Sequence, residues 1–593
     1  MNMMGTTRRV TPGKRDSATD PGLVLAGIAI TVLAVVSIVL VSSVHLSGAD
    51  NAPINPAALT LAIAQDKTPW TGAMTAIAVA ETLLLVGLAT AGVWLYVRRS
   101  NPAARDFDRA ARLMGRGRQI EFLTERGALA KAATLGVPRA FGPGLPLGKA
   151  VAGGKRLYSN WETCTVDIWG PRRGKTLSRI IPGILAAPGA VLATSNKYDY
   201  MVKATRALRR RMGRIWLFDL QKIANHEPDF WWNPLTYITD DDTAEKAVSV
   251  LAVDGVPTGG GGGGSAEFFH KAASRLLKCL LLAAALDRKP APIVAAWTAI
   301  PSDASEAAEI LDRHGWPRLA NEVRAAVASP SDQRGGVFET ALNWASVFTM
   351  STVQAWITDP GDGRPHFDPD AFVRSKDTAY VLSRGKGDGS SAGPIATLLT
   401  VAVCEAAEQF AAEQGGRLQV PLVCQLDEAG NVLRWPAMAE KYTHYGSRGI
   451  LLSAMFQSWS QGVATFGKEG WSTLWDAAGV AIYGGGIKDT DPLGDFSQLI
   501  GQYQYQSVSR SSGGSGGSTS RSAQTERVLD VADLGAIPFG RVIAFGGSAA
   551  PVLIETEFWF NTPLGKKAQH ATDEDDAAST KTLLELNDGG SAR

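Results

Sequence analysis

The chain has 593 residues, of which 45% are hydrophobic and 20% are charged, and its formal net charge is +2. This length allows two or three domains with a large core, and the composition is typical of a globular protein attached to a membrane. The four cysteines lie far apart in apolar runs, which excludes a cysteine-ligated metal site and indicates reduced thiols in a cytoplasmic body.

Two long apolar segments lie near the N-terminus. Residues 22–44 carry no charge, and Glu81 is the only charged residue in 72–97. At 1.5 Å per residue, each segment is long enough to cross a hydrocarbon layer of about 30 Å. A cleaved signal peptide is the alternative for the first segment, but its apolar run is too long and lacks a small-residue cleavage site. We therefore predict an anchor of two transmembrane helices within residues 1–100.

Basic residues flank the two predicted spans on their outer sides. They are Arg8, Arg9, Lys14 and Arg15 before the first span, and Arg98, Arg99, Arg105, Arg109 and Arg112 after the second. The positive-inside rule places both termini in the cytoplasm and predicts a multi-pass protein of the cell membrane. A carboxylate is costly in lipid, so we expect Glu81 to face the other helix, a neighbouring subunit or water.

Residues 101–160 are predicted to connect the anchor to the body. They begin with a basic stretch, 105–118, and become rich in Gly and Pro over 142–146 before the first strands. Both a contact of the arginines with anionic headgroups and a solvated helical face fit this pattern.

Residues 168–176, with the sequence IWGPRRGKT, are typical of a phosphate-binding loop. A strand is predicted before it and a helix after it, so that backbone N–H groups and the helix N-terminus surround the phosphates. Lys175 would add a charge and Thr176 would help to hold Mg²⁺. Trp169 departs from the pattern, because it occupies the position of the first glycine. The residues assigned to nucleotide binding are Gly170, Pro171, Arg172, Arg173, Gly174, Lys175 and Thr176.

Strands and helices alternate after this loop, which predicts parallel βαβ units. The predicted strands are 190–194, 214–219, 377–383, 420–426, 450–455, 475–483 and 542–545. Residues 241–351 interrupt them with helical periodicity only, and include a glycine run at 259–264 expected to be a flexible hinge. We predict an all-α insertion within an α/β domain.

Two acids end the apolar strand 420–426, at the edge of a parallel sheet where nucleotides bind. Asp427 would support Mg²⁺ through water, and Glu428 would polarise the attacking water as a general base. A bare acidic pair is also common at a helix N-terminus, so the prediction depends on its combination with Lys175. Gln457 and Gln461 follow the next strand, and a glutamine there can sense the γ-phosphate or orient water. Gln457 is the better choice, because it lies closer to the end of the strand.

Two polar segments near the C-terminus are predicted to lack regular structure. The Ser/Gly-rich residues 507–526 are expected to form a mobile loop, and the polar residues 561–593 a disordered tail.

Several short motifs, in this order and spacing, resemble the TraG/TraD-like coupling ATPases of conjugative type IV secretion. The motifs are 170–176, 181–182 with 187–189, 194–199, 232–235, 426–431, 448–450 and 457–461. The resemblance covers most of residues 150–560. It implies a RecA-like P-loop NTPase over 161–240 and 352–560, binding ATP and Mg²⁺ and assembled as a hexamer.

The resemblance also implies partners. These are DNA carrying a bound relaxase, and the membrane proteins of a secretion channel through which ATP hydrolysis drives transfer. Arg384 and Arg448 are weak choices for an arginine that reaches a neighbour's nucleotide. Backbone binding without sequence preference is expected, with Lys203, Arg206, Arg209, Arg210, Arg211 and Lys386 as possible contacts or as solvated surface.

Two other functions stay open on the sequence alone. An FtsK-like DNA translocase usually has more spans, a long linker and a C-terminal winged helix, none of which the sequence indicates. A receptor that docks secretion substrates, with nucleotide as an assembly switch, is less consistent with a general base at Glu428.

Overall fold

The computed structural model describes residues 21–49, 51–99, 104, 107–252, 264–384, 392–513, 516–547 and 549–589. It divides into two compact units, residues 1–105 and 106–593. The glycines at 259–263 and Lys386 lie outside the described residues, so the predictions made for them have no structural counterpart.

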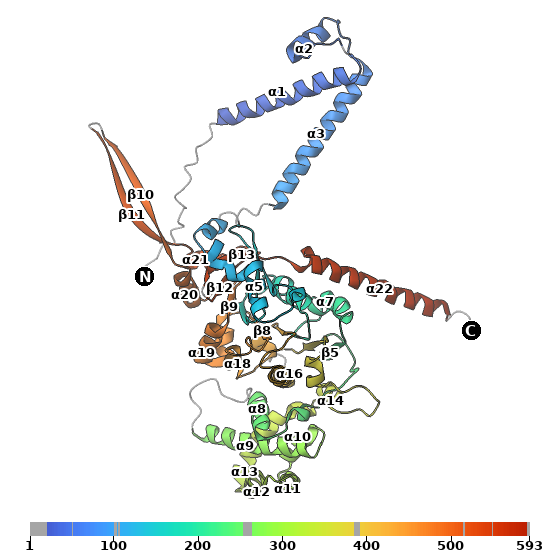
Figure 1. Cartoon of the computed structure of the whole chain (residues 1–593), viewed down its shortest axis with the longest axis vertical. Helices are drawn as coiled ribbons and strands as arrows, with labels where there is room; N and C mark the ends of the chain where they lie inside the picture. The colour runs from blue at the N-terminus through green and yellow to red at the C-terminus, as the bar shows by residue number, and fades with distance from the viewer. Residues whose placement is uncertain are drawn as a thin grey trace. The chain divides into compact units, whose positions relative to one another are not determined.

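The first unit consists of three helices, α1 (Pro21–Leu46), α2 (Pro56–Ala64) and α3 (Gly72–Arg99) (Figure 1). Val44, Leu59 and Met74 form a small buried cluster that joins them. Glu81 of α3 accepts a hydrogen bond of 2.6 Å from the Ser42 hydroxyl of α1. Glu81 thus faces the other helix, one of the three alternatives that the sequence left open.

Within the described residues, one helix is long and apolar enough to cross a membrane, α16 (Gly393–Glu413). However, 78% of its apolar stretch is buried inside the protein. In α1 and α3 the side chains are described over Leu33–Leu46 and Gly72–Leu88, and these stretches taken by themselves are shorter apolar helices. The two transmembrane segments therefore stay a prediction.

An eleven-stranded sheet forms the centre of the second unit, in the order β2-β1-β13-β12-β9-β3-β8-β7-β4-β6-β5. The seven strands from β9 to β5 are parallel, and the four at the other edge pair antiparallel. The strands are β1 (Leu145–Ala150), β2 (Arg156–Ser159), β3 (Thr165–Ile168), β4 (Val191–Ser195), β5 (Ile215–Asp219), β6 (Thr378–Leu382), β7 (Leu422–Leu426), β8 (Ile450–Phe456), β9 (Val480–Tyr483), β12 (Arg541–Gly546) and β13 (Ala549–Glu555).

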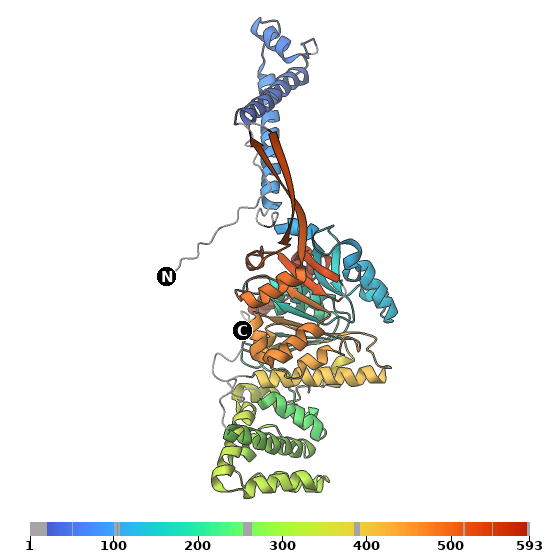
Figure 2. The ribbon, with the colours of Figure 1, turned by 90° about the vertical axis from the view of Figure 1, so that its left-hand side faces the viewer.

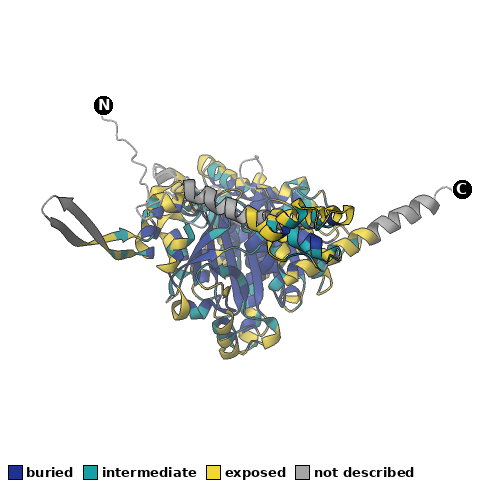
Figure 3. Ribbon diagram, turned by 90° about the horizontal axis from the view of Figure 1, so that it is seen from above, coloured by how far each residue is buried: buried dark blue, intermediate teal, exposed yellow. Residues whose placement is uncertain are grey.

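Helices cover both faces of this sheet, because alternate strand residues point to opposite sides. Leu192 of β4 and Leu452 of β8 pack with α16 and α19, whereas their neighbours Val191 and Leu451 pack with α6 and α7. Figure 3 shows the strands buried between exposed outer helices. The helices are α5 (Glu125–Thr134), α6 (Ile181–Ala186), α7 (Met201–Arg210), α15 (Pro369–Val373), α17 (Ala429–Val432), α18 (Met438–Tyr442), α19 (Trp459–Ala477), α20 (Thr490–Ile500) and α21 (Val531–Gly535).

The helical insertion leaves the sheet after β5 and returns through β6, its neighbour in the sheet. Its helices gather as a separate group at one end of the unit (Figures 1 and 2). They are α8 (Asp241–Leu251), α9 (Gly264–Leu286), α10 (Pro292–Ala299), α11 (Ser305–Arg313), α12 (Pro317–Ala328), α13 (Ser331–Ala345) and α14 (Ser351–Ile357). No strand occurs in 241–252 or 264–351, the described part of the predicted insertion.

Three predictions about local structure are wrong. Residues 507–513 and 516–526 do not form a loop but belong to a β-hairpin, β10 (Gln502–Gly513) with β11 (Gly516–Arg527), drawn as a separate ribbon in Figures 1 and 2. The polar tail forms α22 (Pro563–Gly589). Residues 475–477 end α19, so the strand predicted from 475 begins only at Val480.

Packing explains the ordered start of α22. Its buried residues Ala568 and Ala571 lie on the protein side, and Ala568 packs against Ile181 of α6 and Ala204 of α7. On its acidic turn, Asp575 forms an ion pair with Arg210 at 3.1 Å. A charge-rich sequence thus folds here because a neighbouring helix supplies both an apolar face and opposite charges.

Candidate functional site

The predicted loop lies at the carboxyl edge of the parallel strands. β3 ends at Ile168 and lies between β8 and β9, while β7 lies on the far side of β8. The π-helical turn η4 (Thr176–Ile180) follows the loop and continues directly into α6. The acids after β7 and the glutamine after β8 therefore reach the same edge as Lys175.

Lys175 contacts both predicted acids. Its ammonium lies 2.5 Å from Glu428 Oε1 and 3.1 Å from Asp427 Oδ1. Burial acts to lower the pKa of Lys175, but the two carboxylates outweigh it, so the pKa is raised. Lys175 is therefore a fixed positive charge at the end of the loop.

Asp427 is buried and shared between two loop residues. Its Oδ2 accepts a hydrogen bond of 3.2 Å from the Thr176 hydroxyl, while Oδ1 faces Lys175. Burial raises the pKa of Asp427, an effect that Lys175 opposes. This brings together the hydroxyl and the carboxylate that the sequence assigned to Mg²⁺.

Glu428 is the centre of a polar network. Its Oε2 accepts hydrogen bonds from Gln457 Nε2 at 2.5 Å and from Asn431 Nδ2 at 2.9 Å. Gln461 supports both partners, since its Nε2 donates to Asn431 and its Oε1 accepts from the Gln457 backbone N–H. Sequence reasoning assigned no role to Asn431, although it lies within the motif 426–431.

The backbone of Glu428 has φ 55° and ψ 39°, in the left-handed region. A non-glycine residue there costs of order 1–3 kcal/mol and persists only where its surroundings hold it. Here α17 begins at the next residue, and Glu428 O accepts the N–H groups of Asn431 and Val432. The sharp turn directs the carboxylate back toward Lys175.

A divalent cation fits this group of side chains. Lys175, Asp427 and Glu428 sum to one negative charge at a buried position, and Thr176 adds a neutral oxygen. Among the described residues no three His, Cys, Asp or Glu side chains are grouped to hold a metal by themselves. This donor set suits Mg²⁺, which is usually bound by one or two carboxylates together with substrate phosphates and water.

Trp169 does not behave as a loop residue. It is buried, its backbone N–H donates to Phe456 O at 2.9 Å, and its indole N–H donates to Asp167 at 3.1 Å. Its ring lies over Gly484, where a Cβ would come within 2.1 Å of the indole. Trp169 thus extends β3, and the turn proper begins at Gly170, where a Cβ would meet Gly486 O at 2.5 Å.

We therefore expect Trp169→Gly to destabilise the protein, although it restores the usual motif. Loss of a buried tryptophan costs about 3–5 kcal/mol, because a cavity replaces its contacts. A lower midpoint in thermal unfolding measures this effect. Trp70→Gly is the matched control, since that indole is 41% exposed in the first unit. An unchanged midpoint for Trp169→Gly would contradict the packing role.

Arg173 turns away from the phosphate side of the loop. Its guanidinium donates to three backbone oxygens, those of Gly484 at 3.2 Å, Ile537 at 2.7 Å and Pro538 at 3.1 Å. Burial lowers the pKa of Arg173. Its side chain therefore holds the loop against Gly484 and the segment 537–538, and only its backbone is left for phosphate.

Several other predicted contacts are already engaged within the chain. Arg448 forms an ion pair with Glu408 at 2.9 Å, whereas the side chain of Arg384 is exposed. Arg209 is buried and donates to the backbone oxygens of Ala187, Gly189 and Lys376, so its assignment to DNA contact is wrong.

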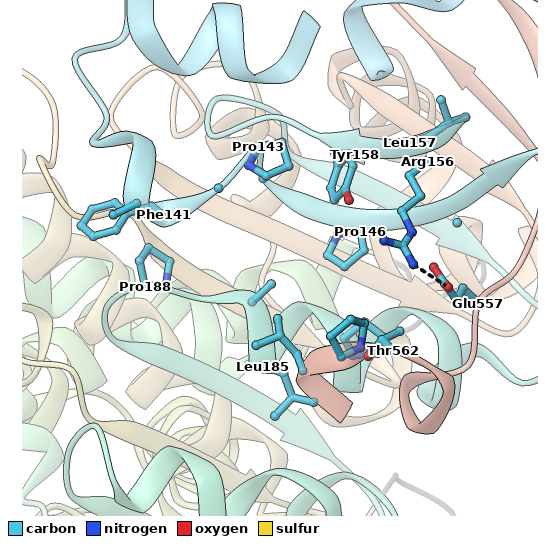
Figure 4. A pocket seen from close by; sticks show the side chains of 18 of the residues that line it. Phe141, Pro143, Pro146, Arg156, Leu157, Tyr158, Leu185, Pro188, Glu557 and Thr562 are labelled. Atoms are coloured by element: carbon cyan, nitrogen blue, oxygen red, sulfur yellow. Dashed lines mark hydrogen bonds and ion pairs between the residues drawn. The ribbon is translucent and has the colours of Figure 1, made fainter. Parts of the chain in front are cut away.

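A separate cavity of about 600 Å³ lies at the far end of α6, and it contains none of the predicted site residues. Its lining is mainly apolar, with the Arg156–Glu557 ion pair of 3.2 Å on one side (Figure 4). Pro182 and Leu185 of α6 and Thr562 contribute to its wall. Lys175 and the acids around it are thus not part of this cavity.

Comparison with protein families matches residues 421–539 to the model described as "TraM recognition site of TraD and TraG". The segment begins one residue before β7, ends at Phe539 and contains Asp427, Glu428 and Gln457. The match confirms the resemblance to TraG and TraD that the motifs predict. No curated protein matches the chain.

Among solved structures, the conjugative coupling protein TrwB (TrwBdeltaN70, unbound) is similar at 17% identity, covering 70% of this chain and 90% of that one with a TM-score of 0.49. TrwB with ADP and Mg²⁺ is similar at 16% identity, covering 67% and 85%, with a TM-score of 0.47. VirB4 of Thermoanaerobacter pseudethanolicus is similar at 12% identity, covering 71% and 98%, with a TM-score of 0.38.

Proposed function

We propose, from the TraD and TraG match of residues 421–539, that this protein is a P-loop ATPase that acts as a coupling protein in conjugative type IV secretion. The observation that carries the ATPase assignment is the convergence of Lys175, Asp427 and Glu428 within 3.1 Å at the carboxyl edge of a parallel sheet. Ligands bind at that edge in open α/β sheets.

ATP is the proposed substrate. The backbone N–H groups of residues 170–174 and the start of η4 would surround its phosphates. Lys175 would exchange its two carboxylate partners for phosphate oxygens, which releases Asp427 and Glu428 for other roles. Thr176 and Asp427 would hold Mg²⁺, which on binding neutralises charge that develops on the phosphates.

Hydrolysis requires a group that accepts a proton from water. Once Lys175 has turned to phosphate, the Glu428 carboxylate is the acceptor nearest the loop, and a general base of this kind contributes about 10²–10⁴-fold in rate. Gln457 Nε2 holds the other oxygen of the same carboxylate at 2.5 Å. Gln457 would therefore hold Glu428 in position and sense whether the γ-phosphate is bound.

The proposed work of this ATPase is to recruit DNA with its bound relaxase and drive it through the membrane channel. A homo-hexamer would place nucleotide between subunits, and exposed Arg384 suits the neighbouring site better than Arg448, which Glu408 holds. Lys203 and Arg206 of α7 are the proposed phosphate contacts, because Lys203 is exposed and its pair with Asp199 is long, at 3.5 Å, whereas Arg210 and Arg211 pair with the acids of α22.

The anchor is proposed to be α1 and α3, spanning the membrane with both termini in the cytoplasm. The support is the apolar sequence of 22–44 and 72–97 with basic residues outside them. Membrane fractionation tests this, since the full chain should resist extraction by salt and residues 106–593 alone should be released.

The function is tested by the ATPase activity of residues 106–593, which form a compact unit, with and without DNA. We expect DNA to raise the rate. Tight binding of a relaxase with no effect of DNA would favour the docking receptor instead. Stimulation by DNA and a requirement in chromosome segregation rather than plasmid transfer would favour an FtsK-like translocase.

A further inference from the structure

Two phenylalanines lie beside the phosphate-binding loop, and a third stacks on one of them. A Cβ on Gly174 would lie 3.2 Å from the ring of Phe558 and 3.6 Å from that of Phe539. The Phe539 and Phe558 ring centroids are 5.8 Å apart at 32°, and Phe560 stacks on Phe558 at 5.6 Å and 22°. The three rings form one aromatic platform, Phe539–Phe558–Phe560, of which Phe539 and Phe558 lie next to Gly174.

Two connections hold this platform in place. Arg173 of the loop donates to Ile537 O and Pro538 O, immediately before Phe539. On the other side, Trp559 packs against the cluster formed by Ile181 and Leu185 of α6. The platform is therefore fixed both to the loop and to the helix that follows it.

Core packing does not account for these rings. Phe539 is 49% exposed and Phe560 is 46% exposed, and Phe558 between them is partly exposed. An exposed hydrophobic patch next to polar residues commonly marks a binding site. Here the polar site is the phosphate loop itself.

We propose that the Phe539–Phe558–Phe560 platform stacks the nucleobase of the bound nucleoside triphosphate. This rests on the proposed ATPase function and adds to it the part of the site that holds the base. The loop and Lys175 would hold the phosphates, and the rings next to Gly174 would receive the aromatic part of the same molecule.

Ring faces recognise an aromatic base but not the pattern of groups on its edge, because every base has a π-face. The carboxylate next to the platform, Glu557, is already held by Lys149 at 3.2 Å and Arg156 at 3.2 Å. The platform would therefore bind a base through the stacked area of the rings, so the affinities for ATP and GTP should be within a few-fold of each other.

Comparing ATP with inorganic tripolyphosphate, which has the phosphates but no base, tests the platform. In equilibrium binding to the full chain at fixed Mg²⁺, Phe539→Ala and Phe558→Ala should each lower the affinity for ATP about 5- to 100-fold. The affinity of both variants for tripolyphosphate should stay within about two-fold of the wild-type value. Phe539→Trp keeps a ring and should keep ATP affinity. Phe268→Ala, an exposed ring in the helical insertion, is the matched control.

Each outcome separates the platform from the proposed ATPase. If both alanine variants bind ATP as the wild type does, or more tightly, the rings do not receive the base, although Lys175→Ala still loses both ligands. If both ligands weaken equally, the phenylalanines only support the loop and the proposal is overturned. If the wild type binds neither ligand, the proposed function fails first.

Discussion

Glu428→Gln should lower kcat for ATP by about 10²–10⁴-fold while leaving the affinity for ATP within a few-fold. The amide has nearly the same shape and can still meet Gln457 and Asn431, so the network around position 428 is kept. It cannot accept the proton of the attacking water. Phosphate release measures kcat, and equilibrium binding measures the affinity.

Glu440→Gln is the matched control for this variant. Glu440 is an exposed acid on α18, outside the network, and its substitution should change neither quantity. Hydrolysis by Glu428→Gln at the wild-type rate would show that another group takes the proton. A loss of ATP binding instead would show that Glu428 is part of the binding site rather than the base.

Lys175→Ala should reduce kcat/KM by on the order of 10²–10³-fold, and binding of ATP and tripolyphosphate should weaken together. The reason is that the ammonium offsets phosphate charge in a site where its side chain is only 13% exposed. The same substitution leaves Asp427 and Glu428 facing each other without a cation. Removal of one partner from a buried pair costs about 3–5 kcal/mol, so the unfolding midpoint should also fall.

Lys271→Ala separates this effect from a general loss of positive charge. Lys271 is exposed on α9 of the helical insertion, pairs with Glu267 at 2.7 Å and has no assigned role in binding nucleotide or DNA. It should leave hydrolysis and stability unchanged. Full ATPase activity in Lys175→Ala would remove the phosphate-binding role from residues 170–176.

The parallel part of the sheet could be predicted from the sequence because each strand is a short apolar run between helices. The strands at 165–168, 191–195 and 422–426 end where the chain changes to polar residues, and those ends carry Lys175 and the acids. Their convergence followed from one rule, that parallel strands share a carboxyl edge.

The hairpin β10–β11 and the helix α22 could not be predicted in this way. Both are rich in polar residues and lack the apolar periodicity that identifies an element. α22 is ordered by its contact with α6 and α7, which lie hundreds of residues away in the chain. The phenylalanines beside Gly174 could not be predicted either, because residues 539 and 558 are far from the loop in the sequence and come next to it only when the chain folds.

Trp169 shows where a motif and a structure differ. The pattern places a glycine there, yet the structure uses this residue to end β3 and to pack against Gly484. The close approach that the glycine would permit is supplied one residue later, by Gly170. Sequence spacing could not reveal this exchange, because it depends on a glycine more than 300 residues away.

The central claim, that ATP hydrolysis at Lys175, Asp427 and Glu428 moves DNA, is tested most directly by translocation. Displacement of streptavidin from the end of a biotinylated DNA measures it. The wild-type protein should displace streptavidin with ATP and Mg²⁺, and Glu428→Gln should bind ATP and DNA but displace none. Hydrolysis of ATP on bound DNA without displacement by the wild type would contradict the account.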